Sequence, residues 1–233
     1  MAKKEDIKEK EGKETVEFFK ELDRDALQTE KFFEKHAKTF AAVIGALVLL
    51  AIGYFAYYQY VIVPKNDEAA LAFLRAQKAL NEGDEKAALG KKGSANPGFI
   101  GTYENYSATD AGKLSAYNAG ILKFREGKFS EAYDLLDKFK SSNKILMAMK
   151  YGAMADCKAN MNKKEDALSL LDKAIAASGD PYTECYFTRK AGMLSLSAKK
   201  KEAAKKYFSK IEEKYRDYDN GMSDAYIEMV KYY

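Results

Sequence analysis

"YNAGILKFREGKFSEAYDLLDKF", residues 117–139, recurs twice more along the chain, and this recurrence predicts the fold. The second copy, "GAMADCKANMNKKEDALSLLDKA" at residues 152–174, follows at a spacing of 35 residues and shares the letters LLDK near its end. The third copy, "TRKAGMLSLSAKKKEAAKKYFSKI" at residues 188–211, is more degenerate. A repeat of this length typically forms one helix–turn–helix unit, and neighbouring units stack to bury a shared core.

Small residues recur at two equivalent positions, which are Gly120, Ala155 and Gly192 in the first helix and Ala132, Ala167 and Ala204 in the second. Two helices pair closely where large side chains are missing, so these positions predict the contact within each helix pair. In the third copy Ala203 fits nearly as well as Ala204, which leaves its register open by one residue. Gly127 and Asn162 fall between the paired helices, where a tight turn needs a residue that tolerates a left-handed backbone.

The period and the small residues resemble the tetratricopeptide repeat (TPR). The resemblance implies a TPR-like α-solenoid of about three to four helix pairs with a C-terminal capping helix. Together with one N-terminal transmembrane helix, which the apolar run at residues 40–63 predicts, the expected chain is all-α. The domain would cover residues 64–233, with repeats at about 114–143, 149–178 and 186–215 and the capping helix at 223–233. No strand-like alternation of any length follows Pro64, which agrees with this expectation.

An uncharged run of 24 residues, 40–63, stands out in a chain in which 32% of residues are charged. A helix of that length is about 36 Å long, which exceeds the thickness of a hydrocarbon core. The apolar part of a signal peptide is shorter, at about 7–15 residues. We therefore expect an uncleaved transmembrane anchor in the lipid bilayer. The span begins at Phe40 and ends at Val63. It contains Gly45 and Gly53, and Tyr57 and Tyr58 lie near its C-terminal end.

The charges on either side of the run predict its orientation. Five Lys and Arg residues lie in residues 20–39, against three in residues 64–83, which favours a cytoplasmic N-terminus. Residues 1–39 then form a cytoplasmic tail, which is expected to be disordered at first and to become an amphipathic helix before the membrane. The repeats would lie on the other side of the membrane.

Composition narrows the function. Two Cys, one His and no Trp leave little material for metal binding or nucleophilic catalysis, so we expect neither an enzyme nor a cofactor nor a metal site. The charges are interspersed and the net charge is only +4, which is unlike a nucleic-acid interface. Cys157 and Cys185 lie in apolar helical segments. They either pack in the core or form a disulfide in an oxidising compartment, and the sequence leaves both alternatives open.

The order of segments along the chain resembles that of the YfgM-type translocon-associated TPR proteins of the bacterial envelope. These segments are the charged tail, "TEKFFEKHAKTF" (29–40), the span, Pro64 and the repeats. The segment "NPGFIGTYENYSATDAGKLSAYNAG" (96–120) is similar to Bacteroidota versions. The resemblance implies a single-pass inner-membrane protein with a cytoplasmic N-terminus and a periplasmic TPR domain, acting as a chaperone-like accessory factor. Its implied partners are Sec translocon subunits, a periplasmic isomerase-type chaperone and exported polypeptide clients. The family offers no catalytic residues.

The TPR arrangement also implies a binding face, because the first helix of each pair lines a concave surface. It places eight candidate protein-binding residues there: Tyr117, Ile121, Phe124, Met149, Asp156, Tyr186, Arg189 and Met193. Aromatic and Met side chains adapt to varied apolar partners. The alternative is that several of these side chains pack against a neighbouring helix as core.

Two other functions fit the same sequence. One is a structural or regulatory scaffold of the cell envelope, which would use the repeats to hold other machinery. The other reverses the topology and makes the protein an import-receptor-like TPR protein with cytosolic repeats.

Overall fold

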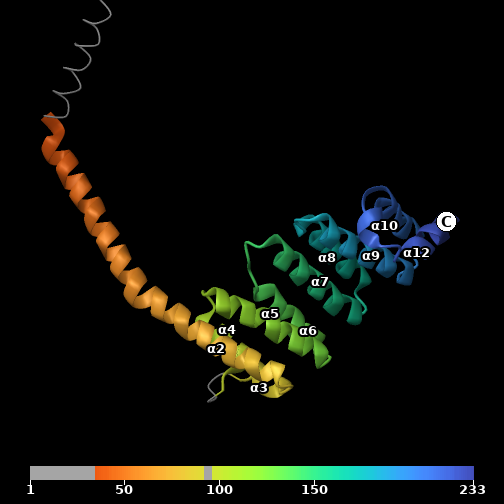
Figure 1. Ribbon diagram of the computed structural model, residues 1–233, viewed down its shortest axis with the longest axis horizontal. Coiled ribbons are helices and arrows are strands. Elements are labelled where there is room, and N and C mark those ends of the chain that lie inside the picture. Colours follow the sequence, from red (N-terminus) through yellow and green to blue (C-terminus); the bar gives the residue numbers. More distant parts are fainter. Residues whose placement is uncertain (1–34, 92–95) are drawn as a thin grey trace, which may run out of the picture. The chain divides into compact units, whose positions relative to one another are not determined.

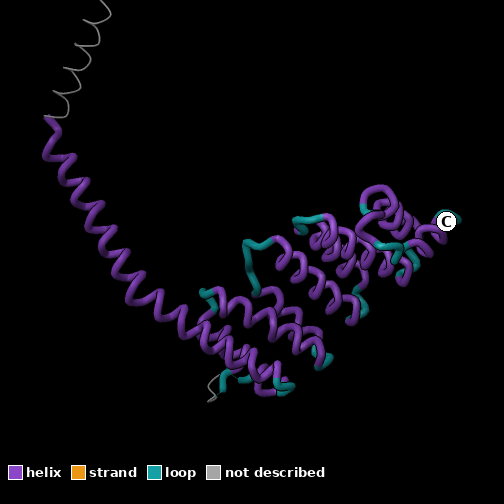
Figure 2. The backbone as a smooth tube through the Cα atoms, in the orientation of Figure 1, coloured by secondary structure: helices purple, strands orange, loops and turns teal. Residues whose placement is uncertain are grey.

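The structure is a computed structural model that describes residues 35–91 and 96–233. Within these residues the chain is helical and contains no strand, which confirms the all-α prediction (Figure 2). The chain divides into two compact units, Met1–Ile62 and Val63–Tyr233. The predicted disordered tail and most of the predicted amphipathic helix lie outside the described residues.

The first unit contains the apolar segment. Its backbone is α-helical over residues 35–57 and then forms a π-helical turn, η1 (Tyr58–Ile62). The helix with this segment, Lys35–Asn81, is the one candidate membrane span in the described residues, with a mean hydropathy of 2.3 in its most apolar 18-residue window. None of that window is buried within the protein. By length and composition this helix can cross a membrane, and its exposed apolar side chains distinguish it from a core helix.

The second unit consists of helices that follow one another with short connections (Figure 1). They are α2 (Val63–Asn81), α3 (Glu85–Leu89), α4 (Gly98–Tyr106), α5 (Asp110–Arg125), α6 (Phe129–Lys138), α7 (Lys144–Asn160), α8 (Lys164–Ala177), α9 (Pro181–Ser197), α10 (Lys201–Lys214), α11 (Arg216–Asp219) and α12 (Asp224–Val230). From α5 to α10 each helix packs against the next, and α7 also touches α5 and α9. The odd-numbered helices α5, α7 and α9 therefore lie side by side in the unit.

Side-chain caps set the starts of these three helices. Thr109 accepts a hydrogen bond from the Gly112 N–H, Asn143 from the Leu146 N–H and Asp180 from the Thr183 N–H. Each bond satisfies a backbone donor that has no partner within the helix. The partner helices α6, α8 and α10 have no side-chain cap and begin directly after a tight turn.

Those tight turns share a left-handed residue. Gly127 has φ 76°, Asn162 φ 60° and Lys199 φ 60°. Glycine takes this conformation without strain and asparagine tolerates it, whereas for lysine it is unfavourable. The turn residues of the first two pairs were predicted correctly, and Lys199 was missed because its side chain gives no turn signal.

The small residues do mark close contacts between helices. A Cβ atom on Gly120 would lie 2.7 Å from Leu136 Cγ, and one on Gly192 would lie 2.8 Å from Phe208 Cζ. Both distances are too short for a side chain to fit without displacing its neighbour. Ala204 is fully buried whereas Ala203 is only partly buried, which settles the register of the third copy.

The two cysteines belong to the core. Cys157 and Cys185 are each 0% exposed, and neither forms a disulfide. Cys157 packs in the cluster around α7 and α8, and Cys185 packs in the cluster formed with α10 and α12. Core packing is therefore the correct alternative of the two that the sequence left open.

Candidate protein-binding face

The three candidates on α5 lie partly in the core. Tyr117, Ile121 and Phe124 are half-buried and pack against the cluster centred on α7 and α8. The ring of Tyr117 lies 5.3 Å from that of Phe139, and the ring of Phe124 lies 5.3 Å from that of Phe129. These side chains stabilise the first helix pair and leave only part of their surface for a ligand.

The candidates on α7 and α9 are more accessible. Met149 is 42% exposed, and Tyr186 and Met193 are each 46% exposed. Leu146, three residues before Met149, is also exposed and was not predicted. We call these four residues the α7–α9 face. Leu146 was missed because periodicity gives the same pattern for buried and exposed apolar positions.

A small residue of α7 allows close contact with α9. Gly152 of α7 lies against the ring of Phe187, and a Cβ atom there would be 2.8 Å from Phe187 Cζ. Burial raises the pKa of Tyr117, and the charge of Tyr186 raises it further.

Between α7 and α9 there is a pocket of about 280 Å³. It is lined by Ala155, Asp156, Ala159, Leu171, Lys190, Met193 and Leu194. Lys190 Nζ donates a hydrogen bond to Asp156 Oδ2 at 2.6 Å, and both side chains remain partly exposed. The pocket is therefore mainly apolar, with one internal ion pair.

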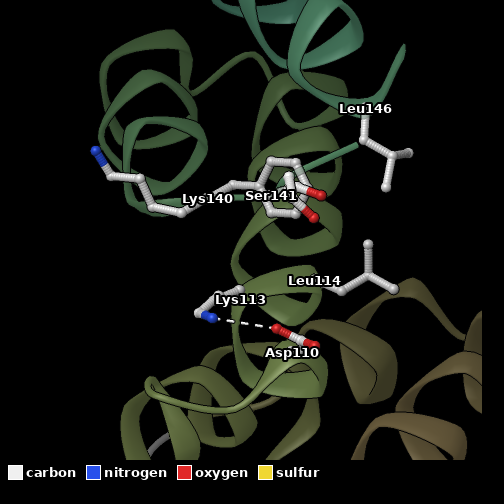
Figure 3. A pocket seen from close by; sticks show the side chains of 8 residues that line it. Asp110, Lys113, Leu114, Lys140, Ser141 and Leu146 are labelled. Atoms are coloured by element: carbon white, nitrogen blue, oxygen red, sulfur yellow. Dashed lines mark hydrogen bonds and ion pairs between the residues drawn. The ribbon is translucent and has the colours of Figure 1, made fainter. Parts of the chain in front are cut away.

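A larger pocket of about 600 Å³ lies where the start of α5 meets the connection between α6 and α7 (Figure 3). Leu114 and Leu146 lie one above the other along one side of it (Figure 3). Lys113 is paired with Asp110 at 3.1 Å, the contact drawn as a dashed line. This pocket was not predicted from the sequence, because its walls come from segments far apart in the chain.

Arg189 has a different role from the one expected. Its Nε lies 3.1 Å from Asp219 Oδ1, and its Nη1 lies 3.0 Å from the sulfur of Met222. Asp219 is buried and also accepts a hydrogen bond of 2.6 Å from the Ser223 N–H. Arg189 therefore ties α9 to the segment around α11, and a ligand would have to compete with Asp219 for it.

Other polar groups of the unit are structural. Lys150 is 2% exposed, and its Nζ donates to the carbonyls of Asp137 and Phe139 at 2.8 and 2.9 Å. Burial lowers the pKa of Lys150 and raises the pKa of the Cys157 thiol to about 11, which makes the thiol unreactive. Within residues 35–91 and 96–233, no group of three His, Cys, Asp or Glu side chains could hold a metal ion.

Comparison with known proteins gives no match, whether to a protein-family model, to a curated protein or to a solved structure.

Proposed function

We propose that this protein is a membrane-anchored TPR-like binding module that acts as a chaperone-like accessory factor of the Sec translocon. It binds partner proteins or emerging exported chains. The observation that carries the proposal is the exposure of Met149, Tyr186 and Met193 on adjacent helices of a helical-repeat unit. Large apolar side chains grouped on one surface are typical of a protein-binding site.

A TPR-like architecture is supported by three observations that agree. The copies repeat at a TPR-like spacing, their small residues lie at helix contacts, and consecutive helices pack as neighbours. In such an arrangement the first helix of each pair lines the binding surface. The exposed candidate residues Met149, Tyr186 and Met193 lie on α7 and α9, which are the first helices of the second and third pairs.

The proposed site of action is the bacterial inner membrane, with a cytoplasmic N-terminus and a periplasmic repeat domain. The excess of positive charge before the span and the resemblance to YfgM-type proteins support it. Translocon subunits, a periplasmic isomerase-type chaperone and exported clients are the proposed partners. A site close to the translocon exit would bring the apolar face near unfolded chains.

Crosslinking from the α7–α9 face tests this function. A photo-reactive amino acid is placed at Met149, Tyr186 or Met193 of the full chain in bacterial cells, and the adducts are identified by mass spectrometry. We expect translocon subunits and exported chains. Tyr232, which is 87% exposed, serves as the matched control position. Recovery of one stable envelope assembly, without translocon or client, would instead favour a scaffold.

The topology is tested separately with a thiol reagent that does not cross membranes. Cys157 and Cys185 are fully buried, so the unmodified chain is expected to stay unlabelled and gives a clean background. Ser130→Cys adds a thiol at an exposed position of the repeat unit. Labelling of this variant in intact spheroplasts is expected. Labelling only after lysis would support the receptor with cytosolic repeats.

The scaffold remains a second candidate because of one observation. Helix α2 exposes Leu71 and Leu74, which form an apolar surface on an element other than α7 and α9. Two such surfaces would allow the unit to hold two partners at once.

A further inference from the structure

We propose that the pocket between α7 and α9 takes a single uncharged apolar side chain of a partner polypeptide, and that the Asp156–Lys190 ion pair sets this preference. The inference rests on one part of the proposed function, that the α7–α9 face binds polypeptides. It adds the chemistry of the bound residue and names the two residues that exclude charged ones.

The size and the walls of the pocket fit a side chain. Its volume of about 280 Å³ lies just below the range of about 300–1,000 Å³ that is common for small-molecule sites. Leu171, Leu194 and Met193 supply apolar contacts, and Met193 adapts to different shapes because its side chain is flexible. Ala155 and Ala159 add little bulk, so the space between the two helices stays open.

The charges of the pocket are already balanced within the chain. Asp156 and Lys190 are the two charged residues of its lining, and they pair with each other at 2.6 Å. The next charged residue of α9, Arg189, pairs with Asp219. A charged partner residue would lose its hydration and find no free counter-charge. An apolar residue has no favourable hydration to lose, and it gains contacts.

The same pair explains how the preference would be enforced. An incoming carboxylate has to displace Asp156 from Lys190, and an incoming ammonium has to displace Lys190 from Asp156. Either exchange leaves one charge of the original pair with only water as its partner, because the side chains of Lys190 and Asp156 are 29% and 37% exposed. The pocket thus rejects both signs of charge and needs no charge of its own for binding.

The test uses the full chain in lipid nanodiscs and fluorescent peptides built from Ser, Gly and Asn with one guest residue. Signals from empty nanodiscs are subtracted. Leu and Phe guests are expected to bind at least about tenfold more tightly than Asp and Lys guests. The free energy gained by burying a Leu or Phe side chain corresponds to a change in affinity of about this size. Added salt is expected to leave the affinity for the Leu guest unchanged, since no net charge is involved.

Variants assign the effect to the pocket. Met193→Glu is expected to weaken binding of the Leu guest by about tenfold, while Tyr232→Glu, at a more exposed position, leaves it unchanged. Lys190→Met removes the partner of Asp156 and is expected to tighten binding of the Lys guest. Asp156→Asn is expected to do the same for the Asp guest. Both charge variants keep a side chain of similar size, and circular dichroism checks their fold.

The inference is overturned if no guest peptide binds, if charged guests bind as tightly as Leu, if binding weakens with salt, or if Met193→Glu has no effect. Crosslinking that yields a second copy of this chain at Met193 would also overturn it. These results are distinct from those that test the proposed function. Translocon adducts without peptide binding would leave that function standing, and peptide binding without translocon adducts would leave the inference standing.

Discussion

Helices α5 and α9 occupy equivalent places in two helix pairs, yet they present different surfaces. Ile121 on α5 and Met193 on α9 each follow the small residue of their helix, Gly120 and Gly192. Ile121 is half-buried against the core, while Met193 is 46% exposed and lines a pocket. The difference teaches that equivalent repeat positions share a backbone contact but not a function, because exposure depends on what the next helix covers.

The largest expected effect separates core from face within the third pair. Phe208→Ala should lower the free energy of unfolding by about 3–5 kcal/mol, because this fully buried ring fills the space beside Gly192. Tyr186→Ala, on the exposed face, should change it by far less. Urea denaturation of the full chain measures both. Equal losses would mean that the α7–α9 face is part of the core.

Lys150 tests how the first two pairs are joined. Lys150→Met should lower the free energy of unfolding by about 1–3 kcal/mol, because the carbonyls of Asp137 and Phe139 lose their buried donor. Lys138→Met, at an exposed position, is the control and should stay within about 0.5 kcal/mol. The same denaturation experiment decides. A stability gain in Lys150→Met would show that desolvation of the ammonium outweighs its hydrogen bonds.

Tyr215 makes the third pair sensitive to alkaline pH. Burial, followed by its hydrogen bond to Glu184, raises the pKa of Tyr215 from 10.0 to about 12. The unfolded chain therefore releases this proton more readily, and the stabilising contribution is complete below about pH 10 and disappears between about pH 10 and 12. Unfolding followed across this range should show a smaller pH dependence in Tyr215→Phe. An unchanged slope would contradict the assignment.

The smallest effects are expected at the turns. Gly127→Ala should lower the free energy of unfolding by about 1 kcal/mol, since alanine at a φ of 76° is strained. Lys199→Gly should raise it by up to about 1 kcal/mol, because it relieves the same strain at a φ of 60°. Thermal unfolding compares the two variants. Opposite signs would confirm that the two turns have the same backbone conformation.

Much of the fold could be read from the sequence because it depends on local chemistry. Gly120 and Gly192 occupy the same position of the repeat, where the two helices of a pair touch. Gly127 and Asn162 permit a left-handed turn between those helices. Less of the candidate site was predictable. Leu114 and Leu146 meet in one pocket although 32 residues separate them (146 − 114), and the role of Arg189 depends on Asp219, 30 residues away (219 − 189).

The sequence by itself determined a helical chain with one apolar segment long enough for a membrane and three related helix pairs. Hydrophobic periodicity, small residues and turn residues act over a few neighbours, so they are visible in one dimension. Only the tertiary structure decided that Tyr117 and Phe124 contribute to the core, that Met149, Tyr186 and Met193 remain exposed, and that Asp156 pairs with Lys190. Burial and ion pairing are set by which helices become neighbours, and a single sequence does not contain those distances.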